Sequence, residues 1–133
     1  MAAGCDVVDV GRLSQVIDRR PAFLARVFTD RERADACRGG VREGSATERA
    51  RLAARFAAKE ATRKATGDLR LGFTAVEVRS TTAGAPRLWI HGQPSPLACS
   101  LSHDGGVAIA MVVGPATTST TSTTSTTSTT STT

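Results

Sequence analysis

The sequence predicts an α+β domain, in which a long helix and shorter helices pack on one face of a mostly antiparallel sheet. Three observations predict it. A short β-branched run, residues 5–10, opens the chain. An alanine-rich segment with helical periodicity follows over residues 47–66, and after Gly72 the apolar pattern takes the period of strands. The order strand, helices, strands is typical of an α+β domain.

The first strand carries an acid where a core residue is expected. Residues 5–10 read Cys-Asp-Val-Val-Asp-Val, and β-branched runs of this length favour a strand. Alternation places Asp6 on one face with Val8 and Val10. A carboxylate on an apolar face indicates a partner that compensates its charge.

Two shorter helices are expected before the long one. Residues 12–20 should form a helix that ends before Pro21. Thr29 and Glu32 have the spacing of a capping box, which predicts a second helix after Phe28.

The long helix has signals at both ends. Ser45 and Glu48 form another capping box, and Gly67 stands where a helix ends in the left-handed conformation. The many alanines between them favour helix and allow close packing against a sheet.

Four strands are predicted after Gly72, over residues 75–81, 87–91, 98–102 and 107–113. The last of them alternates large and small apolar residues, so we expect it to be covered on both faces.

The chain is expected to hold one domain, residues 1–116. Residues 117–133 contain only serine and threonine in a Ser-Thr-Thr repeat. A segment with nothing apolar to bury cannot offset the entropy of ordering, so this tail is predicted to be disordered.

Composition limits the classes of function. The net charge is +5, and 14 of the 17 Lys and Arg residues lie between Arg12 and Lys64. A basic half predicts an anionic partner: nucleic acid, nucleotide phosphates or an acidic protein. Because only 4% of residues are aromatic, stacking platforms for nucleic-acid bases are scarce and nucleic acid is disfavoured.

The three cysteines are far apart in the sequence, which argues against a disulfide framework or a zinc site and fits a reducing compartment. There is no apolar run of about 20 residues and no signal-peptide pattern. We therefore expect a cytoplasmic protein that does not associate with a membrane.

Glu60 is the second misplaced acid. At about 100° per residue it lies between Phe56, Ala57 and Lys64 on the helix. Burying an unpaired carboxylate costs several kcal/mol or more. Its partner could be a metal ion or the adjacent lysine, and the other misplaced acid, Asp6, favours the metal.

Three segments, taken in order, resemble the holo-(acyl carrier protein) synthase group of 4′-phosphopantetheinyl transferases. They are Gly4–Asp9, Arg55–Ala65 and Ser100–Asp104, and the resemblance covers about residues 4–113. Phe28-Thr29-x-x-Glu32 and Gly84-x-Pro86-Arg87 are also similar to the family. The resemblance implies this family's fold.

It also implies an activity: transfer of the phosphopantetheine arm of coenzyme A to a serine of an apo acyl carrier protein, with release of adenosine 3′,5′-bisphosphate. The implied ligands of Mg²⁺ are Asp6 and Glu60. Lys64 would assist the transfer, and the implied coenzyme contacts are Arg55, Lys59, Lys64 and His103.

The resemblance further implies a homotrimer with active sites between subunits. In this family a basic first helix docks the acidic carrier protein, and the docking surface here would be Arg12, Arg19, Arg20 and Arg26. The base that takes the serine proton is left open between Glu60 and a metal-bound water.

Less specific interpretations stand beside these. A Lys-Glu-Ala segment is often a solvated helix face, and Asp6 could cap a turn or pair with an arginine. Asp9 is better placed to cap the next helix than to bind metal, and His103 could be an ordinary hairpin residue. The alternative function is a basic, non-catalytic module that binds RNA or an acidic protein through its arginines.

Overall fold

The computed structural model describes residues 1–116, and the Ser/Thr repeat that was expected to be disordered lies outside the described residues. Along the chain the elements are β1 (Ala2–Asp9), α1 (Val10–Arg19), α2 (Ala22–Val27), α3 (Asp30–Ala36), α4 (Ala46–Thr66), the 3₁₀ helix η1 (Phe73–Ala75), β2 (Val76–Ser80), β3 (Pro86–Ile90), β4 (Gln93–Pro94), β5 (Ala98–Asp104) and β6 (Val107–Gly114).

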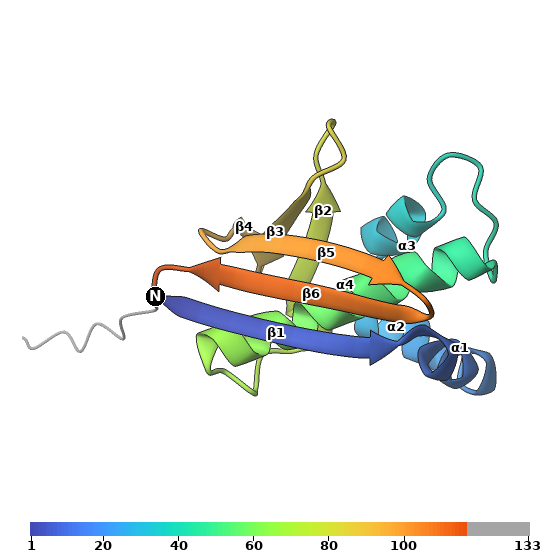
Figure 1. Cartoon of the computed structure of the whole chain (residues 1–133), viewed down its shortest axis with the longest axis horizontal. Helices are drawn as coiled ribbons and strands as arrows, with labels where there is room; N and C mark the ends of the chain where they lie inside the picture. The colour runs from blue at the N-terminus through green and yellow to red at the C-terminus, as the bar shows by residue number, and fades with distance from the viewer. Residues whose placement is uncertain (117–133) are drawn as a thin grey trace, which may run out of the picture.

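The strands form two antiparallel sheets. One has the order β1-β6-β5, so its first and last strands in sequence are neighbours, and the other has the order β2-β3-β4. Helix α4 lies behind the first sheet, and the β2–β3 hairpin stands beside its β5 edge (Figure 1). The α+β prediction is therefore confirmed, with the strands divided between two sheets.

Helix α4 and strand β1 are in direct backbone contact. A Cβ built on Gly4 would lie only 2.0 Å from the carbonyl oxygen of Ala61. Ala57 and Ala61 are fully buried beneath the sheet, as expected for a helix rich in small residues. This close approach brings the residues that follow Gly4 in β1 beside the last turns of α4.

The helix ends follow from side chains in the sequence. Asp9 Oδ1 accepts a hydrogen bond from the Arg12 amide at 2.8 Å, so Asp9 caps α1, as expected. The capping box of Thr29 and Glu32 is formed at the start of α3. Gly67 ends α4 with φ of 70°, the left-handed cap predicted for it.

The second capping box is only half formed. Ser45 Oγ accepts from the Glu48 amide at 3.2 Å, as predicted. The Glu48 carboxylate, however, accepts from the amide of Gly44 at 3.1 Å rather than from Ser45. Glu48 also forms an ion pair with Arg49 at 3.1 Å. The Glu48 carboxylate therefore bonds to Arg49 and to the amide one residue before the one that a capping box predicts.

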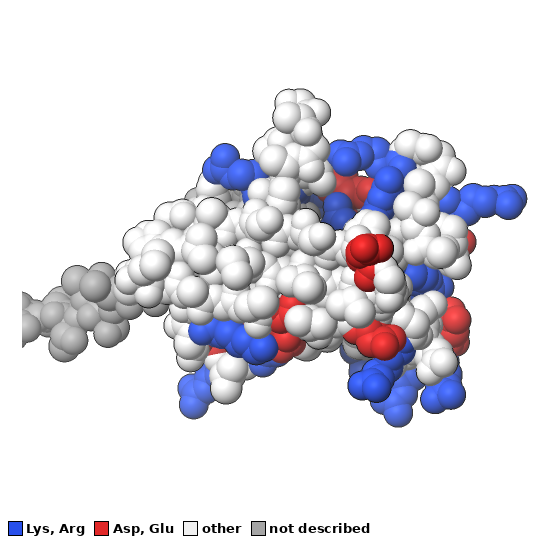
Figure 2. Space-filling view, viewed as in Figure 1, with Lys and Arg blue, Asp and Glu red and all other residues white. Residues whose placement is uncertain are grey.

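The prediction that β6 is covered on both faces is wrong for the single chain. Alternate residues of β6 are buried against α4, but Ile109 and Met111 are 42% and 52% exposed. Their neighbour in β1, Val7, is 61% exposed. The small alanine side chains on the inner face of β6 let α4 pack close to the strand. No described element covers the outer face of β6, which is largely uncharged (Figure 2).

Helix α2 was not predicted. It has six residues and no side-chain cap, so it is too short to show a helical period in the sequence. Among the described residues, no helix is long and apolar enough to cross a membrane.

Candidate active site

Asp6 and Lys64 meet where β1 crosses α4. Lys64 Nζ donates to Asp6 Oδ1 and to the Cys5 carbonyl oxygen, each at 3.0 Å. The Asp6 side chain is 18% exposed and that of Lys64 is 52% exposed. Asp6 thus has a lysine as its partner, which is neither the turn cap nor the arginine pair considered from sequence.

Glu60 lies one helical turn before Lys64, so their side chains share a face of α4. Glu60 Oε1 accepts from a terminal nitrogen of Arg63 at 3.2 Å, and its side chain is 28% exposed. The nearest cation to Glu60 is therefore Arg63 and not Lys64. The structure nonetheless gathers Asp6, Glu60 and Lys64 on one side of the molecule.

The two carboxylates fit a hard divalent cation. They come from separate elements, both reach solvent, and each has a basic side chain beside it. Within residues 1–116 there is no group of three or more His, Cys, Asp or Glu side chains that could hold a metal. Two carboxylates completed by water and phosphate oxygens are typical of Mg²⁺, whereas Zn²⁺ takes three or four protein ligands.

Arg55 lies elsewhere, in a cavity of about 220 Å³ between α4 and the β2–β3 hairpin. It is buried, and it donates to the Arg51 carbonyl oxygen at 3.1 Å and to Ser80 Oγ at 3.4 Å. Its Nε is buried without a hydrogen-bond partner in the described part of the chain. Burial lowers the pKa of Arg55, and the carboxylate of Asp35 opposes this shift.

Sequence reasoning missed two residues of this cavity, Arg38 and Arg51. Arg51 precedes Arg55 by one turn of α4, so the helical period could have identified it. With Arg55 they bring three guanidinium groups to one cavity that has a single lining carboxylate, Asp35. The cavity is suited to an anion.

Lys59 was expected to contact coenzyme phosphates, but the structure places it in the core. Its side chain is fully buried, and Nζ lies 2.7 Å from Glu32 Oε1. Nζ also donates to the carbonyl oxygens of Phe73 and Val76. Because all three donors are used inside the fold, we withdraw Lys59 as a coenzyme contact.

His103 lies on β5, at the opposite edge of the first sheet from Asp6. It is exposed. Leu101, two residues earlier on the same strand, lines the Arg55 cavity. The expected site residues therefore form two groups: Asp6 with Glu60 and Lys64 on the β1 side, and Arg55 with His103 on the β5 side.

The expected docking arginines are all exposed, on α1 and the residues that follow it. Figure 2 shows basic atoms gathered over α1 and α2. Beside them an apolar pocket of about 320 Å³ reaches from Asp6 to Phe23 and Phe56. A basic rim around an apolar hollow is suited to a partner helix that is acidic and amphipathic.

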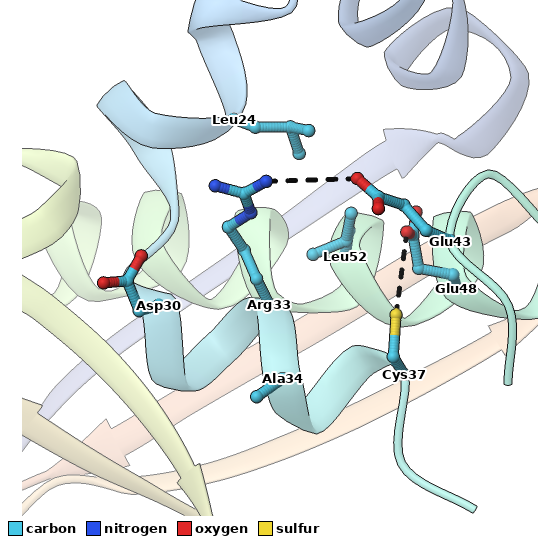
Figure 3. Close-up of a pocket in the computed structure, with 8 residues that line it drawn as sticks. All are labelled: Leu24, Asp30, Arg33, Ala34, Cys37, Glu43, Glu48 and Leu52. Atoms are coloured by element: carbon cyan, nitrogen blue, oxygen red, sulfur yellow. Dashed lines mark hydrogen bonds and ion pairs between the residues drawn. The ribbon is translucent and has the colours of Figure 1, made fainter. Parts of the chain in front are cut away.

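A further pocket lies between α3 and the start of α4 (Figure 3). Cys37 Sγ points to Glu48 Oε2, 3.9 Å away, and Arg33 pairs with Glu43 at 3.9 Å. Burial and the carboxylate of Glu48 raise the pKa of Cys37. The thiol is therefore protonated at neutral pH, so this pocket holds no activated nucleophile.

Comparison with known proteins agrees with this geometry. Residues 2–112 match the model of the 4′-phosphopantetheinyl transferase superfamily. A holo-[acyl-carrier-protein] synthase of Frankia alni is 42% identical over 123 residues, covering 85% of this chain and 95% of the relative. The corresponding synthase of Streptomyces coelicolor is 39% identical with the same coverage.

Solved structures give the same result. A holo-(acyl-carrier-protein) synthase from Bacillus anthracis, in complex with CoA (3′,5′-ADP), superposes with a TM-score of 0.71 at 30% identity, over 86% of this chain and 96% of that one. The Helicobacter pylori synthase with coenzyme A gives 0.70 at 27% identity, over 85% and 99%. The chain therefore belongs to the 4′-phosphopantetheinyl transferase superfamily and, within it, to the holo-[acyl-carrier-protein] synthases.

Proposed function

We propose that this transferase uses Mg²⁺ to move the 4′-phosphopantetheine arm of coenzyme A to a serine of an apo acyl carrier protein, releasing adenosine 3′,5′-bisphosphate. One observation carries the proposal. Lys64 of α4 contacts Asp6 of β1 at 3.0 Å, and Glu60 lies one helical turn before Lys64 on α4. Two acids and a cation on one surface suit the diphosphate of coenzyme A.

Asp6 and Glu60 would hold the metal ion, which supplies charge neutralisation at the diphosphate oxygens. The carboxylates are supplied by a strand and a helix in backbone contact, at Gly4 and Ala61. Such rigid elements keep two ligands in place without the metal. This is the property that a site of only two protein ligands needs.

Lys64 has a role of its own. Its ammonium group donates to two oxygens of β1, and the side chain is half exposed. The ammonium group can therefore move to contact a phosphate at a small desolvation cost. In the transfer, the serine oxygen bonds to the phosphorus that carries pantetheine. The bond from that phosphorus to the bridging oxygen breaks, and its electron pair leaves with the bisphosphate. The serine proton passes to Glu60 or to water at the site.

Arg55 and His103 would bind the other end of the coenzyme. The Arg55 cavity has an excess of guanidinium groups and an unpartnered Nε, which suits the remaining phosphates. These residues and Asp6 lie at opposite edges of the first sheet. One coenzyme molecule could contact both groups if the β5 edge of one copy stands beside the β1 edge of another.

Assembly into a trimer is therefore part of the proposal. The uncovered outer face of the first sheet, with Val7, Ile109 and Met111 exposed, is the surface we assign to it. An apolar strip of this kind on an otherwise basic protein is typical of a subunit interface. The number of subunits, three, is what the resemblance of the sequence motifs to the holo-(acyl carrier protein) synthase group implies.

The carrier would dock on the surface of Arg12, Arg19, Arg20 and Arg26. This surface adjoins the apolar pocket that Asp6 also lines. An acidic carrier seated there would present its serine near Asp6. Charge complementarity of this kind accelerates encounter and makes the reaction sensitive to salt.

The test is a change of mass. The protein is incubated with coenzyme A, Mg²⁺ and an apo acyl carrier protein, and the carrier is weighed. A gain equal to one phosphopantetheine arm, present with Mg²⁺ and absent with a chelator, supports the proposal. No gain on a panel of carriers would favour the non-catalytic basic module.

A further inference from the structure

The outward face of the β2–β3 hairpin carries a second basic pocket, of about 270 Å³, lined by Arg31, Arg79, Arg87 and Trp89 among others. It is not the Arg55 cavity. Side chains of β2 alternate between faces, and Val78 faces the Arg55 cavity, while Ser80, the last residue of the strand, lines both pockets. The arginines of the second pocket therefore stand on the other side of the hairpin.

The pocket concentrates like charges. Arg79 and Arg87 are directly opposite each other in the β2–β3 register, an arrangement that destabilises a strand pair. Arg31, from α3, supplies a third guanidinium. The acid in contact with this group is Glu77, whose Oε1 accepts from Arg79 Nε at 2.5 Å. Three cations and one carboxylate leave two positive charges in excess.

Glu77 responds to these charges. Burial alone would raise its pKa, but a hydrogen bond with Thr29 lowers it. The charges of Arg79 and Arg31 lower the pKa of Glu77 further. Arg31 on α3 and Arg79 on β2 therefore act on the same small region.

Arg79 is held ready to bind. Its guanidinium carbon lies 3.7 Å from the centre of the Trp89 ring, and its Nε is fixed by Glu77. In the part of the chain that the structure describes, its two terminal nitrogens have no hydrogen-bond partner. A stacked, oriented guanidinium loses little entropy on binding, and its fork matches two oxygens of a phosphate.

We propose that the pocket formed by Arg31, Arg79, Arg87 and Trp89 binds the phosphate or diphosphate group of a small molecule, at a site separate from the transfer site. An excess of two charges matches a phosphate dianion. The volume is below that of a pocket that encloses a whole drug-sized ligand, so the ligand is inorganic or inserts only its phosphate end. The inference does not depend on the proposed function.

Trp89 provides a direct readout, because it is the only tryptophan in the chain. Its emission is recorded while the full-length protein is titrated with inorganic phosphate, pyrophosphate or adenosine 5′-monophosphate, without divalent metal. Potassium chloride at equal ionic strength is the reference. We expect a saturable change with the phosphate ligands and none with chloride, and the tightest of the three identifies the source of the phosphate.

Variants locate the response. Arg87 is exposed and lines the pocket. Arg87→Gln removes one charge-assisted contact, which should weaken phosphate binding by about tenfold or more. Arg31→Gln is a second variant from a different element. Arg42→Gln makes the same charge change outside the pocket, and Lys64→Met alters the transfer site; both should leave the Trp89 response unchanged.

Two results would overturn the inference. One is a response that does not saturate, or that Arg87→Gln and Arg31→Gln leave at full affinity while circular dichroism shows them folded. The other is displacement of pyrophosphate by RNA or by an acidic carrier protein at lower concentration, which would make this face a macromolecular contact.

Discussion

Lys59 and Glu32 form an ion pair of 2.7 Å in the centre of the molecule, where neither side chain is exposed. The carboxylate of Glu32 also accepts from the amides of Thr29 and Val78, both at 3.0 Å. The pair thus ties α3, α4 and β2 together. It also explains why Lys59, in the segment Arg55–Ala65 that resembles the family, has its ammonium group engaged inside the fold.

Removing the Lys59 charge should unfold the protein rather than weaken coenzyme binding. Lys59→Met leaves the Glu32 carboxyl group buried and without its cation, which should lower the free energy of unfolding by about 3–5 kcal/mol. Urea unfolding followed by circular dichroism measures this. Lys64→Met, at a half-exposed pair, is the control and should cost less than about 1 kcal/mol. A Lys59→Met protein as stable as the wild type would contradict the role of the pair.

Gly4 should tolerate no side chain. A Cβ there would lie 2.0 Å from the Ala61 carbonyl oxygen, so Gly4→Ala must push β1 away from α4, at a cost of about 2 kcal/mol or more. Gly11→Ala is the matched control, since the nearest atom to its Cβ would be 3.5 Å away. In helix α1 that change should be neutral or stabilising. Thermal unfolding of the two variants separates the cases, and equal melting temperatures would argue against the close contact.

The outer face of the first sheet should determine assembly. Met111→Glu places a charge on the exposed apolar strip, and we expect it to turn the proposed trimer into monomers and to abolish transfer, because the two groups of site residues would no longer meet. Leu69→Glu, at a side chain 71% exposed in the segment between α4 and η1, is the control. Sedimentation of both variants beside a transfer assay decides the matter. A monomeric wild-type protein with full activity would refute the assembly.

Cys99 gives a prediction with pH. Burial raises its pKa to about 11 from the ordinary 9.0, so at pH 8 only about one thiol in a thousand is ionised, against about one in ten when unfolded. Alkylation of Cys99 at pH 8 should therefore speed up about 100-fold in urea. Because the folded pKa is the higher one, the associated stability is complete below pH 9 and is lost between pH 9 and 11. Peptide mass spectrometry measures the rate, and equal rates in both states would contradict the burial.

Local signals in the sequence predicted the elements well where chemistry acts within a few residues. Thr29 with Glu32, Asp9 and Gly67 fixed helix ends that the structure has. The division into two sheets did not follow, because pairing of β1 with β6 joins residues about a hundred positions apart. No local pattern encodes that register.

The same difference between local and long-range signals applies to the candidate site residues. Asp6 and Glu60 were singled out because an acid on an apolar face is conspicuous in one sequence, and their role as metal ligands stays a prediction. The burial of Lys59 could not be found, since its partner Glu32 comes from another helix. The open face of β6 looked like a doubly covered strand, because an exposed apolar face and a core surface have similar composition.

The sharpest test of the shared metal site is a double-mutant cycle on the initial rate of Mg²⁺-dependent carrier modification. Asp6→Asn and Glu60→Gln should each reduce the rate by about 100-fold or more, and the double variant should lose little more than either single one, because both acids act through one ion. Asp9→Asn keeps the cap of α1 and should retain the wild-type rate. Full Mg²⁺-dependent activity in Glu60→Gln, or strictly additive losses, would contradict a cation shared by Asp6 and Glu60.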